Sequence, residues 1–484
     1  MIPELLPPSG FGVRLSRRTE VRDGGAMLTG RSGSVLFLSA PARGVVARLP
    51  LVLSDDPTEA RVARELLDRG LAEPCWPGPP PADDAVADVT VVIPVRDRPL
   101  ELARLLRSLP TGIAVVVVDD ASRDPVHASR ADVVRLDRNA GPAAARNAGL
   151  ARVRTPYVAF VDSDVEPVPG WLGLLRRHLD DPAVALVAPR VLGREERVGD
   201  SWLERYEQAR SSLDLGADPA VVRVHGPVSY VPGACLLGRV DALGGGFDEV
   251  MRAGEDVDLV WRLTAAGHHV RYEPAARVAH AHRTAPRDWL ARRASYGASA
   301  APLARGHPGA ARPLALSPWS AAAWLAVALG RPAIGAGITG AAAGLLAREL
   351  RGTVERPAGL AVRLAGLGTV RSGRVVADAL VRTWWPAGAA GALRSARLRR
   401  VMAAAALAGP LLDHRSQRPP LDPVRWTALR LLDDAAYGWG VWLGCLRART
   451  PDPLLPDLSW RMRSCTGAEL VRAGDTVARC QTFR

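Results

Sequence analysis

The chain has 484 residues, enough for two or three domains, and its formal net charge is +13. All of its basic residues are arginine, and no basic segment is interleaved with aromatic side chains, so the charge does not indicate nucleic-acid binding. Five cysteines without Cys-x-x-Cys or zinc-ligand spacing indicate reduced thiols in a cytosolic setting. The short, proline-rich stretch at 1–8 lacks the pattern of a signal peptide.

Residues 1–75 predict a small N-terminal domain, which a proline-rich linker at 76–87 separates from the rest. Two short apolar runs around a turn at 30–33 are typical of a hairpin, and Ser39 and Asp56 stand where helix N-caps are expected. A hairpin with small helices of this kind resembles the PqqD-like domains, which hold precursor peptides during natural-product maturation. The resemblance implies a winged-helix-type domain that binds an extended peptide by strand addition. A small packing domain without a ligand is the alternative.

Strands and helices alternate at short spacing from residue 88 onward, which predicts an α/β domain over 88–300. The predicted strands are 89–93, 114–118, 133–136 and 157–161, and the predicted helices between them are 100–109 and 143–153. Continuous apolar strands indicate a parallel sheet covered on both faces, with ligand-binding residues where the strands end. The first strand is not followed by Gly-x-Gly-x-x-Gly, and no Walker Gly-Lys-Ser/Thr is present, which disfavours a dinucleotide oxidoreductase and a P-loop NTPase.

Two carboxylates, Asp162 and Asp164, directly follow the predicted strand at 157–161. Carboxylates in that position are unfavourable unless a cation lies between them. A hard divalent ion, Mg²⁺ or Mn²⁺, is the usual partner, because it prefers carboxylate and phosphate oxygens. The same spacing also occurs by chance in loops, so the pair alone does not establish a metal site.

Five segments in order resemble the family 2 glycosyltransferases, which have the GT-A fold. They are Val91–Arg96, Val118–Ser122, Asn139–Asn147, Asp162–Asp164 and Gly254–Leu259. The resemblance covers roughly residues 88–285. It implies a nucleotide-sugar donor, in particular a UDP-sugar, and transfer with inversion at the sugar carbon.

The resemblance also implies roles for individual residues. The residues that it places around the nucleotide sugar are Pro94, Val95, Arg96, Asp120, Asn139, Arg146 and Asp162, with Asp120 beside the uracil and Arg146 beside the diphosphate. It places a divalent cation on Asp164 and Asp162, with His282 as a further ligand after a strand at 276–279. For His280 and His282, ordinary hydrogen bonding is the alternative.

The general base implied by the resemblance is Asp256. An acceptor hydroxyl is a poor nucleophile, so a carboxylate within hydrogen-bond reach is worth about 10²- to 10⁴-fold in rate. Asp256 precedes an amphipathic helix, and at the positive helix end a carboxylate tends to stay ionised. The alternative is that Glu255 and Asp256 only cap this helix.

Residues 301–484 predict a helical region. Its apolar runs, 314–329, 333–346 and 435–446, are each shorter than the roughly 20 residues of a membrane-spanning helix. Their small residues suit packing in lipid, and an arginine-rich surface suits anionic lipid. We therefore expect membrane association on the cytoplasmic face, with alanine-rich cytoplasmic helices as the alternative.

As a whole, the chain resembles the glycosyltransferases of mycofactocin maturation. This implies metal-dependent, inverting transfer of a hexose, expected to be glucose from UDP-glucose, to a peptide-derived redox cofactor precursor. The implied product is a β-1,4-linked oligosaccharide, and other maturation proteins are the implied partners. Two alternatives remain: a family 2 transferase that builds cell-envelope glycan on a lipid or polysaccharide acceptor, and an inactive scaffold that presents a precursor peptide.

Overall fold

The computed structural model describes residues 5–30, 34–194, 201–281, 285–352, 354–458 and 480–482. This chain divides into two compact units. Residues 1–14 and 50–284 belong to the first unit, and residues 15–49 and 285–484 to the second. The N-terminal segment that was predicted as one small domain therefore contributes residues to both units.

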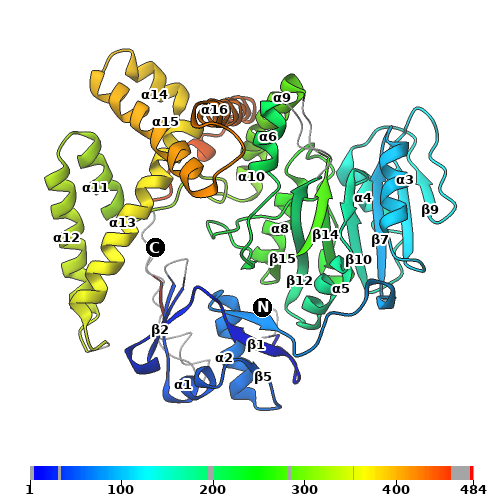
Figure 1. Cartoon of the computed structure of the whole chain (residues 1–484), viewed down its shortest axis with the longest axis horizontal. Helices are drawn as coiled ribbons and strands as arrows, with labels where there is room; N and C mark the ends of the chain where they lie inside the picture. The colour runs from blue at the N-terminus through cyan, green and yellow to red at the C-terminus, as the bar shows by residue number, and fades with distance from the viewer. Residues whose placement is uncertain are drawn as a thin grey trace. The chain divides into compact units, whose positions relative to one another are not determined.

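The first unit contains a mixed β-sheet that the described residues build from nine strands (Figure 1). Along the sheet, eight of them follow the order β11 (Val165–Pro167), β15 (His269–His280), β12 (Val184–Gly193), β14 (Cys235–Arg239), β10 (Tyr157–Val161), β7 (Val89–Val95), β8 (Ala114–Asp119) and β9 (Asp132–Arg135). The ninth, β13 (Ala220–Val221), pairs with β15. Strands β10, β7, β8 and β9 are parallel, and β14 runs antiparallel to β10 and β12. The predicted α/β sheet is confirmed, but it is mixed rather than wholly parallel, because β14, β11 and β13 pair antiparallel with their neighbours.

Helices pack on this sheet because their apolar sides face it. Helix α4 (Pro142–Leu150) packs against β7 and β8, and α8 (Glu255–Ala265) packs against β15. In α3 (Pro99–Ser108), Leu102 and Leu105 are buried in the core. The core strands expose almost none of their side-chain surface, as their continuous apolar sequences predicted.

Residues 50–75 are held in the first unit by a buried ion pair. Helix α2 (Pro57–Asp68) begins at Asp56, whose side chain accepts a hydrogen bond from the backbone N–H of Thr58, so this predicted cap is confirmed. From α2, Arg64 donates to both carboxylate oxygens of Asp181, at 2.9 and 3.0 Å. Arg64 also lies 3.1 Å from the ring Nδ1 of His269. Because Asp181 is fully buried, this segment is part of the packing of the large sheet rather than a loosely attached module.

The second unit contains the predicted hairpin. Strands β3 (Met27–Thr29) and β4 (Ser34–Phe37) are antiparallel, and they join β2 (Glu20–Arg22) and β16 (Cys480–Thr482) in one sheet. Helix α1 (Ala40–Ala47) follows, with Ser39 as its N-cap, as predicted.

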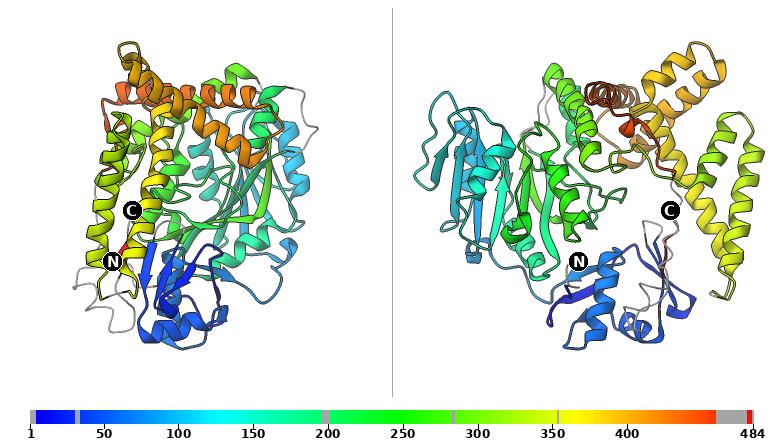
Figure 2. Two further views of the ribbon diagram at one scale, coloured as in Figure 1. Left: turned by 60° about the vertical axis from the view of Figure 1, so that its left-hand side comes forward. Right: turned by 180° about the vertical axis from the view of Figure 1, so that it is seen from behind.

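Of the residues that the structure describes, the rest of the second unit is mostly helical, as expected. Its helices are α9 (Pro286–Ala298), α10 (Ala300–Gly306), α11 (Pro318–Ala328), α12 (Pro332–Glu349), α13 (Pro357–Arg382), α14 (Trp385–Ala392), α15 (Ala396–Gln417) and α16 (Pro423–Ala448). Helices α11, α12 and α13 pack side by side (Figure 2). Of the helices that the structure describes, none combines the length and the apolar character needed to cross a bilayer. Membrane association stays a prediction.

Candidate active site

Carboxylates gather where neighbouring parallel strands end. Strand β8 ends at Asp119 and is followed by Asp120, and β10 is followed by Asp162 and Asp164. Strand β7 lies between β8 and β10, and its last residue is Val95. Since the carboxyl ends of parallel strands meet at one edge of a sheet, these groups share the position at which ligands bind in α/β folds.

Asp120 holds the loop that leads into α4. Its two carboxylate oxygens accept hydrogen bonds from the backbone N–H groups of Ala140 and Gly141, at 2.7 and 2.9 Å. The N–H of Asp120 donates to the carbonyl of Val95. The structure thus brings the predicted nucleotide residues of β7, β8 and the 139–141 loop together.

The other predicted nucleotide residues differ in how accessible they are. Arg96 and Asn139 are exposed, and Pro94 is partly exposed. The side chain of Val95 is buried, so only its backbone can face a ligand.

Asp119, next to Asp120, is fully buried and structural. Burial opposes its ionisation, but hydrogen bonds from Ser122, Val126 and Arg135 outweigh that effect and lower its pKa. Asp119 therefore stabilises the turn that presents Asp120.

The two carboxylates after β10 have different partners. Asp162 accepts a hydrogen bond from Nη2 of Arg146 at 2.7 Å. Asp164 pairs with Arg98, and its Oδ2 lies 3.6 Å from Nε2 of His280. Burial alone would raise the pKa of Asp164, but its electrostatic interactions with His280 and Arg98 and the hydrogen bond from Arg98 lower it.

The side chains of Asp162 and Asp164 suit a divalent cation that is bound jointly by the protein and a nucleotide substrate. Among the residues that the structure describes, no group of three or more His, Cys, Asp or Glu side chains is arranged to hold a metal ion. Mg²⁺ at such sites is typically bound by one or two carboxylates, with substrate phosphates supplying further oxygens. Asp164 and Asp162 can provide that set, and His280 lies beside Asp164. The predicted ligand His282 lies outside the described residues.

Asp256 lies in the first turn of α8, and it does not cap the helix from outside. The N-cap is Gly254, which has a φ of 86° and no side chain to form a cap. The carboxylate of Asp256 instead accepts hydrogen bonds from the N–H of Gly233 at 2.7 Å and of Val257 at 2.8 Å. Burial, together with the negative charge of Glu255, raises the pKa of Asp256 to about 6, so it is ionised at neutral pH and able to take up a proton.

Arg146 connects Asp162, which follows β10, to Glu255, which begins α8. Only 3% of it is exposed. Its Nη1 donates to Glu255 at 2.8 Å, while Nη2 donates to Asp162 at 2.7 Å and to the carbonyl of Gly233 at 3.3 Å. Sequence reasoning placed Arg146 beside the diphosphate and missed these partners, which lie as far as 109 residues away.

Arg98 lies among the candidate site residues, although the sequence did not predict it there. It stands at the start of α3, directly after the strand that was predicted to line the nucleotide, and its side chain is 33% exposed. Its position after that strand was the signal available in the sequence. Nothing in the sequence indicated its pairing with Asp164, which lies 66 residues away.

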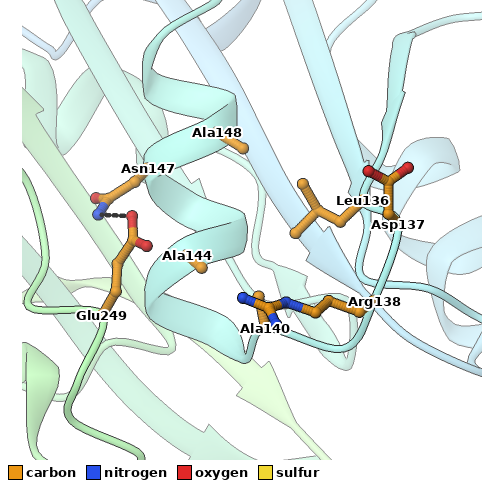
Figure 3. A pocket seen from close by; sticks show the side chains of 8 residues that line it. All are labelled: Leu136, Asp137, Arg138, Ala140, Ala144, Asn147, Ala148 and Glu249. Atoms are coloured by element: carbon orange, nitrogen blue, oxygen red, sulfur yellow. Dashed lines mark hydrogen bonds between the residues drawn. The ribbon is translucent and has the colours of Figure 1, made fainter.

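One cavity is lined by neither Asp120, Asp162, Asp164 nor Asp256. It is a groove of about 600 Å³ beside α4 (Figure 3), lined by Leu136, Asp137, Arg138, Ala140, Ala144, Asn147, Ala148 and Glu249. Ala144 and Ala148 are one turn apart on α4, so they share a face, whereas Arg146 projects from the opposite side of the helix. None of the predicted catalytic or metal residues lines the groove.

Comparison with known proteins gives matches over this region and over the whole chain. Residues 90–245 match the family described as Glycosyl transferase family 2. The pre-mycofactocin glycosyltransferase of Mycobacterium tuberculosis (strain CDC 1551 / Oshkosh) is 42% identical over 476 residues, which cover 93% of this chain and 98% of that protein. The succinoglycan biosynthesis protein ExoO of Rhizobium meliloti (strain 1021) is 31% identical over 217 residues, 41% of this chain and 61% of that protein. The structure of the mannosyltransferase PcManGT from Pyrobaculum calidifontis, in complex with GDP-Man and Mn2+, matches with 17% identity and a TM-score of 0.36 over 61% of this chain and 90% of that chain.

Proposed function

This chain belongs to glycosyltransferase family 2, and on that premise we propose that it transfers a hexose from a UDP-sugar to a peptide-derived redox cofactor precursor. The support for this acceptor is the similarity to a pre-mycofactocin glycosyltransferase over nearly the whole chain. The proposed hexose is glucose, and the proposed product is a β-1,4-linked oligosaccharide.

The observation that carries the proposal is the position of Asp256. Its carboxylate is fixed by Gly233, and Arg146 connects the same turn of α8 to Asp162. In the proposed reaction Asp256 takes the proton of the acceptor hydroxyl, and the oxygen bonds to the anomeric carbon. The bond from that carbon to the diphosphate oxygen breaks, and its electron pair leaves with the diphosphate. One displacement inverts the carbon, so an α-linked donor gives a β-linked product.

Charge on the departing diphosphate requires cations. Asp164 and Asp162, with His280 beside them, would hold Mg²⁺ or Mn²⁺, which when bound neutralises charge on the diphosphate oxygens. Arg98 is partly exposed beside Asp164 and supplies a second positive charge there. A guanidinium suits phosphate oxygens because it offers several N–H donors in one plane.

The nucleotide is proposed to bind along the ends of β7 and β8. Pro94 and Arg96 would contact it from β7, and Asn139 from the loop that Asp120 holds. Since both oxygens of Asp120 accept from backbone N–H groups, we propose that Asp120 shapes the uracil pocket as well as bordering it.

Product analysis tests the proposal. The chain is incubated with Mn²⁺, with UDP-glucose or GDP-mannose as donor, and with either a peptide-derived precursor or a polyprenyl phosphate as acceptor. We expect mass spectrometry to show hexose added to the precursor from UDP-glucose. Transfer to the polyprenyl phosphate alone would instead support a cell-envelope function and contradict the proposed acceptor.

A further inference from the structure

Arg146 contacts both Asp162 on the proposed metal side and Glu255 beside the proposed base with one side chain. It comes from α4, while Asp162 follows β10 and Glu255 begins α8. Its Nη2 donates to Asp162 at 2.7 Å and its Nη1 to Glu255 at 2.8 Å. The guanidinium also lies over the ring of Phe247, 5.2 Å from the ring centre.

Gly233 carries the connection on to the base. Its carbonyl accepts from Nη2 of Arg146 at 3.3 Å, and its N–H donates to Asp256 at 2.7 Å. A side chain at this position would meet both groups, because a Cβ on Gly233 would lie 3.1 Å from Cβ of Asp256 and 3.3 Å from Nη2 of Arg146. A shift of the guanidinium therefore reaches Asp256 by two routes, through Gly233 and through Glu255.

The side chain of Arg146 is buried against protein groups, and its Nε, which has no hydrogen-bond partner among the described residues, is shielded from solvent as well. Both of its terminal nitrogens already donate to protein oxygens, and only 3% of the residue is exposed. Arg98, which is 33% exposed and pairs with Asp164, is accessible to a diphosphate bound beside that carboxylate.

We propose that Arg146 is a positioning residue that fixes the base Asp256 relative to the metal-side carboxylate Asp162, and that Arg98 is the arginine that contacts the diphosphate of the donor. This inference rests on the proposed function, since it names the base and the leaving group. It assigns the two arginines separable effects, one on the base and one on nucleotide binding.

Electrostatics around Asp256 make the two effects measurable. The charged groups that act on Asp256 are Glu255 on its own helix and Arg146 on α4, and its backbone donors are Gly233 and Val257. Removing the positive charge of Arg146 should raise the pKa of Asp256 above its value of about 6. Removing the negative charge of Glu255 should lower it. Shifts of opposite sign in the two variants would show that both charges act on Asp256, and the comparison of kcat with UDP affinity then distinguishes positioning of the base from donor binding.

The test compares Arg146→Met, Arg146→Lys, Glu255→Gln and Arg98→Gln, with Arg107→Gln on the exposed side of α3 as the matched control. Calorimetry gives the Kd for UDP with Mn²⁺, and ¹³C NMR titration of the Asp256 carboxyl, assigned with Asp256→Asn, gives its pKa. Neither measurement needs turnover, so both remain informative if hexose transfer itself is not found. Steady-state kinetics then adds kcat and KM.

We expect Arg146→Met to leave the UDP Kd within about threefold, raise the Asp256 pKa and lower kcat by about 10²-fold, with partial recovery in Arg146→Lys. Arg98→Gln should weaken UDP binding about tenfold or more and leave the Asp256 pKa unchanged. A tenfold loss of UDP affinity in Arg146→Met with an unchanged Asp256 pKa would overturn the proposal. If Arg146→Met does not fold, Glu255→Gln decides, since an unchanged Asp256 pKa in that variant would overturn it as well.

Discussion

The carboxylate of Asp256 is anchored by the backbone N–H of Gly233, at 2.7 Å, from a segment 23 residues earlier in the chain. Its neighbour Glu255 is instead bound to Arg146. The two adjacent carboxylates thus have different surroundings: Glu255 is bound by a guanidinium, whereas Asp256 accepts hydrogen bonds from the backbone N–H groups of Gly233 and Val257, which fits its proposed role as the base.

Replacing the base should separate chemistry from binding. In Asp256→Asn the shape is kept and the proton acceptor is lost, so we expect kcat to fall by about 10²- to 10⁴-fold while UDP affinity persists. Asp241→Asn, at an exposed carboxylate on α7 (Val240–Leu243), is the control. Loss of UDP binding in Asp256→Asn, measured by calorimetry, would show that Asp256 is structural.

The pH dependence of kcat/KM should report the same carboxylate. As the proposed base, Asp256 would act in its ionised form, and because its pKa is about 6, activity should fall as the pH drops below about 6. The relevant measurement is kcat/KM from pH 5 to pH 8. A profile that stays flat down to pH 5 would be inconsistent with Asp256 as the base.

Asp256 should also make the folded chain less stable at neutral pH. Its folded pKa of about 6 lies above the ordinary value of 3.8, so its favourable contribution is complete below pH 3.8 and is lost as the pH rises through 6. Asp256→Asn removes this loss, and we expect its melting temperature to exceed that of the unsubstituted chain at pH 7.5 but not at pH 4.5. A lower melting temperature at both pH values would contradict this reasoning.

The buried pair of Arg64 and Asp181 should matter for stability. Asp181→Ala leaves the guanidinium of Arg64 buried without this partner, a change that typically costs about 3–5 kcal/mol in the free energy of unfolding. The matched control is Asp180→Ala, because the neighbouring Asp180 pairs with Arg176 at the surface and should contribute at most about 1 kcal/mol. Denaturant titration measures both, and equal losses would refute the assignment.

The fold was predictable where local patterns determine it. The continuous apolar strands, the caps at Ser39 and Asp56, and the position of Asp162 after β10 all follow from residues close together in sequence. The division of the N-terminal segment between two units cannot be predicted from such local patterns. It depends on distant contacts, such as the ion pair of Arg64 with Asp181, which are 117 residues apart.

The contacts within the candidate site were not predictable from the sequence. Motif order predicted Asp120, Asp164 and Asp256 as site residues, yet nothing in the sequence shows which carboxylate Arg146 or Arg98 contacts. In the helical region, charged residues on α16 such as Asp433 and Asp434 are buried against arginines, although charged residues are usually exposed. In the candidate site and on α16 alike, the paired residues come from distant parts of the chain, so local sequence patterns do not reveal their contacts.

Metal dependence has its own test. We expect Asp164→Ala to abolish transfer, and Mn²⁺ titration followed by electron paramagnetic resonance in the presence of UDP to show weakened binding. Asp162→Ala should lower transfer severely without abolishing it, since the carboxylate of Asp162 is also hydrogen-bonded to Arg146. Full activity of the unsubstituted chain in excess chelator would exclude metal-dependent transfer.

The configuration of the newly formed glycosidic bond tests most directly whether Asp256 promotes a single displacement. The measurement is the anomeric proton coupling, by NMR, in the product made from an α-linked UDP-hexose. A β-linked product is predicted, because one attack by the deprotonated acceptor inverts the carbon. An α-linked product would contradict both the role of Asp256 and the inverting reaction.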